Sequence, residues 1–99
     1  MIVVDHAVAD WFLLRDGSDA YWLDVNCNSS ATGFSILLQL NDTELPHVLA
    51  GRHAGCAQLA AQIQARPHAY AVRDHSALHG SRVLAAVQAC RAAAGATAA

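Results

Sequence analysis

The chain has 99 residues, enough for one domain that buries a single hydrophobic core without a metal or a disulfide framework. Its formal net charge is −2 and its six basic residues, all arginine, are scattered, which excludes the basic stripe typical of nucleic-acid-binding proteins. No apolar run approaches the roughly 20 residues of a membrane-spanning helix, and the first residues do not resemble a signal peptide. We therefore expect a cytoplasmic protein with free thiols, and the lysine-free, alanine-rich composition suggests a bacterial source.

Alternation of apolar and polar residues predicts a three-stranded antiparallel meander in the first half of the chain. The expected strands cover residues 7–15, 20–28 and 32–40, joined by short polar connections. The strand at 20–28 separates most clearly into two faces. Its core face is expected to hold Tyr21, Leu23, Val25 and Cys27, and its open face Trp22, Asp24, Asn26 and Asn28.

The first predicted strand is ambiguous, because both of its alternating sets are apolar. We assign Phe12 and Leu14 to the core, since Asp10 and Asp16 at the strand ends then reach solvent. This assignment places Trp11 on the open face of the sheet.

A helix is expected over about residues 42–65. Asn41 is a favourable N-cap, and Glu44 is placed to reach back to the backbone N–H of the cap. Gly51 and Gly55 interrupt the apolar stripe, so we expect one helix with room for a kink at the glycines.

The chain between the two helices is left open as a short strand or an extended loop over residues 68–73. A second helix is expected to follow, capped by Ser76 or Ser81, with a buried stripe formed by Val83, Leu84, Val87 and Cys90. The predicted fold is α+β: a meander followed by two helices packed on one sheet face. Residues 1–91 form the expected domain, and residues 92–99 a frayed tail.

The open sheet face is the predicted binding surface, because an aromatic side chain beside amides and a carboxylate is typical of recognition surfaces. The expected binding residues are Trp22, Asp24, Asn26, Asn28, Trp11 and Gln39. The alternative is that a tryptophan on this face packs under arginine stems or a terminal segment.

Histidine and cysteine have ligand-like spacing at two places, His53-x2-Cys56 and His75-x3-His79. Nitrogen and thiolate ligands in a set of four suit tetrahedral zinc. The alternative is a set of surface histidines with a core cysteine, because Cys56 falls on the apolar stripe of the first helix. We expect no cofactor, with zinc as the alternative.

Catalytic motifs are lacking: the sequence has no phosphate loop, dinucleotide fingerprint or serine elbow. A thiol enzyme that pairs Cys27 with Asp74 and His75 is a further alternative, but the inward position of Cys27 favours an inert thiol. We therefore expect a small non-catalytic binding or interaction module. Its expected partner is another protein or a second copy in a homodimer, and neither nucleic acid nor a membrane is expected.

Three runs of the chain, at residues 14–28, 33–41 and 73–87, together resemble a group of short bacterial single-domain proteins of uncharacterised function. The resemblance implies a strand meander followed by helices, and it implies no activity, ligand or catalytic residue. Aromatic or aliphatic residues are usual in that group where His75 and His79 stand here, which weakens the zinc hypothesis.

Overall fold

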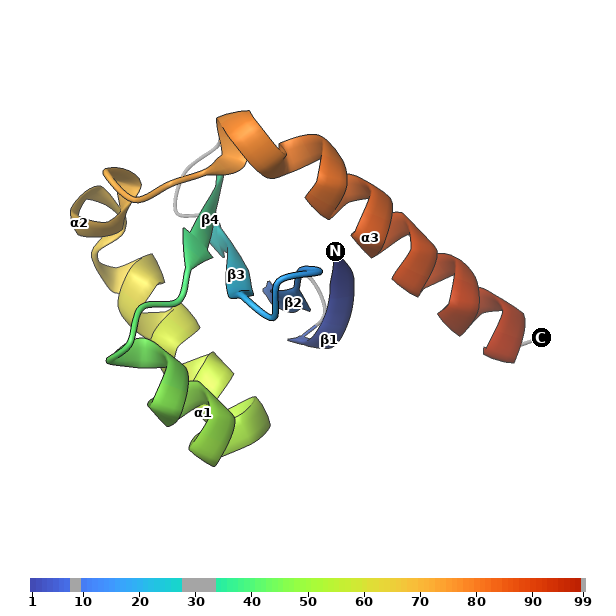
Figure 1. Ribbon diagram of the computed structural model, residues 1–99, viewed down its shortest axis with the longest axis horizontal. Coiled ribbons are helices and arrows are strands. Elements are labelled where there is room, and N and C mark those ends of the chain that lie inside the picture. Colours follow the sequence, from blue (N-terminus) through green and yellow to red (C-terminus); the bar gives the residue numbers. More distant parts are fainter. Residues whose placement is uncertain (8–9, 28–33, 99) are drawn as a thin grey trace.

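The computed structural model describes residues 1–7, 10–27 and 34–98. In this part of the chain, four antiparallel strands form one sheet in the order β1-β2-β3-β4, accompanied by three helices (Figure 1). The strands are β1 (Ile2–Ala7), β2 (Trp11–Arg15), β3 (Tyr21–Cys27) and β4 (Phe34–Gln39). The helices are α1 (Glu44–Ala65), α2 (Pro67–Ala71) and α3 (Ser76–Ala98). The predicted α+β class is confirmed.

Two elements of the described chain differ from the prediction of three strands and two helices. β1 is an additional strand at the edge of the sheet, and its side chains alternate only between exposed and half-buried positions. Because neither face of β1 is strongly buried, the sequence has no clear apolar alternation that marks this strand. Residues 68–73, predicted as a strand or extended loop, lie mostly in α2, where Pro67 begins the helix at a position that needs no N–H donor.

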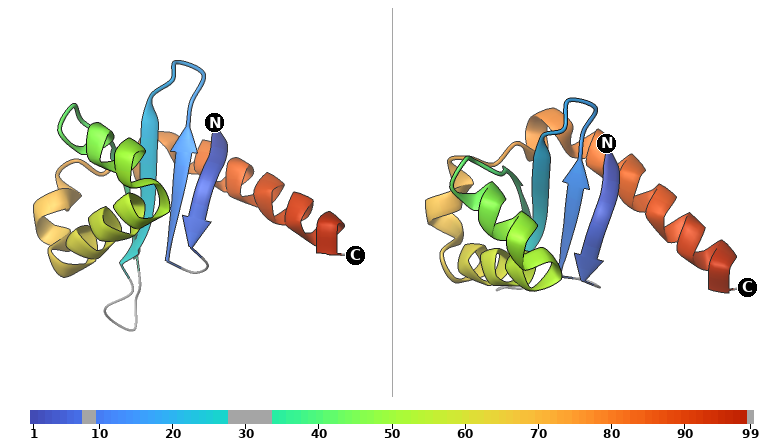
Figure 2. Two further views of the ribbon diagram at one scale, coloured as in Figure 1. Left: turned by 90° about the horizontal axis from the view of Figure 1, so that it is seen from below. Right: turned by 60° about the horizontal axis from the view of Figure 1, so that its bottom comes forward.

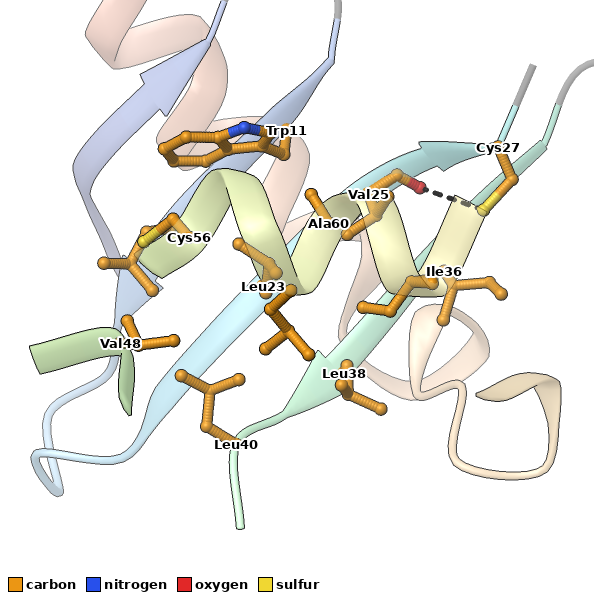
Figure 3. Close-up of a cluster of buried hydrophobic side chains, with 13 residues drawn as sticks. Trp11, Leu23, Val25, Cys27, Ile36, Leu38, Leu40, Val48, Cys56 and Ala60 are labelled. Atoms are coloured by element: carbon orange, nitrogen blue, oxygen red, sulfur yellow. Dashed lines mark hydrogen bonds between the residues drawn. The ribbon is translucent and has the colours of Figure 1, made fainter. Parts of the chain in front are cut away.

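α1 covers one face of the sheet and buries the larger of two hydrophobic clusters (Figure 3). Leu23 and Val25 of β3 are fully buried there, as predicted. Trp11 pairs with Val25 across the β2–β3 register, so it also lies under α1. The assignment of Phe12 and Leu14 to this core is therefore wrong. Because both sets of β2 side chains are apolar, strand pairing rather than the local pattern decides which set faces α1.

α3 covers part of the opposite sheet face, as Figure 2 shows. The second hydrophobic cluster, on this face, consists of Leu14, Trp22, Leu37, Val83, Ala86 and Val87. The prediction that both helices pack on one face is therefore wrong: the apolar side chains on the outer face also need a cover. The C-terminal turns of α3 extend past the sheet, so the predicted domain boundary after residue 91 falls within this helix.

Asp74 fixes the start of α3 against β4. Its Oδ1 accepts hydrogen bonds from the backbone N–H of Leu37 at 2.9 Å and of Ser76 at 3.0 Å. The Ser76 hydroxyl donates to the same oxygen at 2.6 Å, and the N–H of His75 donates to the Leu37 carbonyl at 2.9 Å. Asp74, rather than Ser76 or Ser81, therefore caps the first turn of α3, and the same carboxylate anchors that turn to β4.

The N-terminus of α1 is joined to the segment before α3. Asn41 and Glu44 form the predicted reciprocal cap: Asn41 Oδ1 accepts from the Glu44 N–H at 2.8 Å, and Glu44 Oε1 accepts from the Asn41 N–H at 3.0 Å. The two terminal guanidinium nitrogens of Arg73 donate to the Glu44 carboxylate, at 2.8 and 3.0 Å, and one of them also donates to the Gln39 carbonyl at 2.9 Å.

α1 bends at Arg52, whose φ of 54° and ψ of −129° interrupt the helix. The bend brings its two arms together at Gly55, where an added Cβ would lie 2.7 Å from the His47 carbonyl oxygen. The predicted kink is thus present, but a non-glycine residue adopts the strained backbone conformation and Gly55 permits the close approach.

Candidate functional site

Trp22 lies beneath α3 and is only 4% exposed. Its indole Nε1 donates a hydrogen bond to Asp16 at 3.0 Å. The rings of His75 and His79 pack edge-on against it, with centroid distances of 5.4 and 5.0 Å. The prediction that Trp22 is exposed to a partner is therefore wrong, because α3 covers this part of the sheet.

Asp24 follows Trp22 by two residues in β3, so it lies on the same sheet face, at the border of the area that α3 covers. In the strand register it pairs with Phe12 of β2 on one side and with Leu37 of β4 on the other. A half-buried carboxyl group thus stands between two apolar side chains. No described residue donates a hydrogen bond to it.

The next row of the same sheet face is polar, with Asn26 of β3 opposite Ser35 of β4. Between this end of the sheet and α3 lies a cleft of about 440 Å³. Asp24 and Asn26 line its sheet side, and Val83 and Val87 line its helix side. The cleft therefore combines apolar walls with a few polar groups that belong to rigid strands.

Three charged side chains of the described structure line the cleft: Asp10, Asp24 and Arg91. Burial raises the pKa of Asp24 to about 6, and the negative charge of Asp74 adds to the increase. Arg91, also in the lining, holds its guanidinium carbon 6.0 Å from the centre of the Phe12 ring. The carboxylate of Asp10 accepts a hydrogen bond from Gln64. Asp24 is thus an ionisable group near neutral pH that lacks a donor among the described residues.

Of the other expected binding residues, Trp11 is among those that line the cleft and Gln39 is not. Trp11 is 1% exposed, and its indole Nε1 finds no acceptor among the described residues. Its ring packs on the α1 face at 4.9 Å from the His53 ring, so its predicted exposure is wrong. Gln39 is exposed at the end of β4, and Asn28 lies outside the described residues.

The four residues predicted as alternative zinc ligands are split between the two faces of the sheet. On the α1 side, Cys56 is fully buried in the core, and His53 Nδ1 lies 3.0 Å from an Asp5 carboxylate oxygen. On the α3 side, His75 and His79 pack against Trp22. Within the described ranges, no three histidine, cysteine or acidic side chains are grouped as metal ligands would be.

The buried cysteines have little thiolate character. Burial raises the pKa of Cys27, and the negative charges of Asp24 and Asp74 add to the effect. Burial also raises the pKa of Cys56 to about 11, with a contribution from Asp5. Both thiols are expected to stay protonated and unreactive near neutral pH.

Several residues of the cleft were not among the expected binding residues. They are Phe12, Leu37, Val83, Val87 and Arg91. The predicted buried stripe of α3 is correct for Val83 and Val87, but Leu84 is 56% exposed and Cys90 is only half-buried. The side of the sheet on which this stripe packs has no local signal, so the cleft itself was not predictable.

Among the described helices, none is both long enough and apolar enough to cross a membrane. The similarity to short bacterial proteins stays a prediction. Comparison of the chain with family models, curated proteins and solved structures found no match in any of the three.

Proposed function

We propose that the protein is a non-catalytic binding module that takes its ligand in the cleft between α3 and the sheet. The observation that carries this proposal is Asp24, a half-buried carboxyl group without a donor in the described structure, at the border of the cleft. Burying a charge without a partner costs stability, and such groups are concentrated at functional sites.

The dimensions and composition of the cleft support a small-molecule or side-chain-sized ligand. Pockets that bind such ligands measure about 300–1,000 Å³ and combine apolar walls with few polar groups. The volume of about 440 Å³ lies in this range. The described lining contains no cysteine, which argues against thiol catalysis at this cleft.

A fragment screen followed by amide chemical shifts tests this proposal. Ser35 is exposed and lines the cleft, so Ser35→Trp is expected to fill the polar end while the strand tolerates the aromatic residue. Ser81→Trp, on the exposed surface of α3 outside the lining, is the matched control. Fragments should shift the amides of Asp24, Asn26 and Val87 in the wild type and in Ser81→Trp, but not in Ser35→Trp. Fragments that cluster elsewhere would overturn the proposal.

Self-association through β1 is a second proposal, compatible with the first. β1 is the outer strand of the described sheet, and its Ile2 and Val4 are 53% and 49% exposed. An open strand edge with apolar side chains is a common surface for pairing between two copies. In sedimentation experiments the wild type should be a dimer and Val4→Lys should be a monomer. A monomeric wild type would contradict this proposal.

A further inference from the structure

We infer that the ligand of the α3–sheet cleft is a small organic cation, with an ammonium group that binds Asp24 and an apolar body that lies between the sheet and α3. This inference rests on the proposed binding function and adds the chemical class of the ligand. Its support comes from the charges, the missing donors and the apolar surface around Asp24.

The charges around Asp24 favour a cation. Asp10 lines the same cleft, and Asp74 adds a second negative charge from the segment before α3. Among the described residues that line the cleft, the basic one is Arg91. Its side chain is exposed and lies over the Phe12 ring rather than in an ion pair with Asp24. The inner part of the cleft is therefore negative when Asp24 is ionised.

The missing hydrogen bonds of Asp24 discriminate between ligand classes. A carboxylate that is partly removed from water needs donors, and the described protein supplies none. An ammonium group supplies both hydrogen bonds and the opposite charge, whereas an alcohol supplies one weaker bond. A carboxylate ligand would face repulsion from Asp24 and would leave both charges without a partner.

Apolar surface on both sides of Asp24 sets the requirement for the rest of the ligand. Phe12 and Leu37 are its neighbours in the strand register, and Val83 and Val87 lie on the helix side of the cleft. Leu37, Val83 and Val87 are almost fully buried, but Leu84 of the same lining is 56% exposed and Phe12 is half-buried. A purely polar cation would leave the apolar surface of Leu84 and Phe12 in water, so an alkyl or aryl body should add affinity. The expected ligand is thus an amphipathic amine rather than a free metal ion or an inorganic cation.

Three probes with the same aromatic body test the inference: 2-phenylethylammonium, 2-phenylethanol and 3-phenylpropanoate. Affinities are measured by amide shift titration at pH 7.5. The ammonium probe should bind at least about tenfold more tightly than the alcohol, a difference of about 1.4 kcal/mol, and the carboxylate probe should bind most weakly. The shifts should centre on Asp24 and Val87.

Two variants show whether Asp24 carries the preference. Asp24→Asn keeps the shape of the side chain and removes its charge, so the ammonium and alcohol probes should bind it with nearly equal affinity. Asp42→Asn, an exposed carboxylate outside the cleft, should keep the wild-type preference. A preference that persists in Asp24→Asn would overturn the role of this residue.

The remaining outcomes separate the inference from the proposed function. If all three probes bind in the cleft with similar affinity, the cleft is a binding site but its selectivity for cations is refuted. If none of the probes binds while neutral fragments bind and are blocked by Ser35→Trp, the inference fails and the proposed function stands. If no compound of any class shifts the cleft residues, both fail.

Discussion

Leu37 stands directly opposite Asp24 in the β3–β4 register, and Phe12 stands opposite it on the other side. This arrangement surrounds a carboxyl group with apolar side chains where a neutral residue would be more stable. Binding sites often retain residues that reduce the stability of the fold. The electrostatic cost of Asp24 is therefore measurable without knowledge of the ligand.

Asp24→Asn is expected to stabilise the protein at pH 7 by about 2 kcal/mol, because a pKa near 6 in the folded state exceeds the ordinary value of 3.8. The folded state holds this proton more strongly than the unfolded state, so Asp24 reduces stability as the pH rises from about 4 to about 6. The gain should therefore disappear near pH 4. Urea unfolding at both pH values checks it, with Asp42→Asn as a control, and a destabilised Asp24→Asn at pH 7 would contradict the expectation.

The bend in α1 gives a prediction that reverses the usual order of helix propensity. Arg52 has a φ of 54°, a conformation that glycine adopts without steric cost. Arg52→Gly should be more stable than Arg52→Ala by about 1 kcal/mol, although alanine is the better residue in an ordinary helix. Both variants lose the same side-chain interactions, so the difference isolates the backbone. Thermal unfolding measures it, and a more stable alanine variant would show that the bend relaxes at no cost.

Replacement by alanine should destabilise the protein at Gly55 but not at Gly51. A Cβ at residue 55 would lie 2.7 Å from the His47 carbonyl oxygen and 3.2 Å from the Val48 Cα, both backbone atoms. We expect Gly55→Ala to destabilise the protein by about 2 kcal/mol because the two arms of α1 must separate. Gly51 has nothing within 4 Å of such a Cβ, so Gly51→Ala should be neutral or stabilising by up to about 1 kcal/mol. Equal effects in chemical denaturation would argue against the close approach.

Glu44→Gln is expected to destabilise the protein by about 1–2 kcal/mol at pH 7, because Glu44 accepts two bonds from Arg73 and one from the Asn41 N–H. Burial opposes ionisation of Glu44, but these hydrogen bonds outweigh it, so the pKa of Glu44 is lowered. The stabilisation is therefore present above the ordinary pKa of 4.5 and is lost as the pH falls. The difference between variant and wild type should shrink in acid unfolding curves, and a difference that does not depend on pH would exclude the ion pair as its source.

Local patterns predicted those features that depend on neighbouring residues. The alternation of residues 20–28 correctly placed Leu23 and Val25 in the core, and the spacing of Asn41 and Glu44 predicted the reciprocal cap. The same alternation placed Asp24 on the sheet face opposite this core, but it also predicted an exposed Trp22, which α3 buries.

Features that depend on distant contacts were not predictable. The apolar stripe of α3 fits either face of a sheet, so its position against Trp22 follows only from the tertiary structure. The orientation of Trp11 depends on its pairing with Val25, because both faces of β2 are apolar. The cleft exists because α3 covers one part of its face and not the row that carries Asn26, and a one-dimensional pattern does not contain this relationship.

The two tryptophans lie on opposite faces of one sheet, Trp11 under α1 and Trp22 under α3. Each indole is therefore an intrinsic reporter of a single interface. Trp22→Phe leaves fluorescence that follows the detachment of α1, and Trp11→Phe leaves fluorescence that follows the detachment of α3. Coincident unfolding curves would mean that the sheet couples its two layers into one cooperative unit, and separate curves would mean that α3 can dissociate while the rest of the domain stays folded.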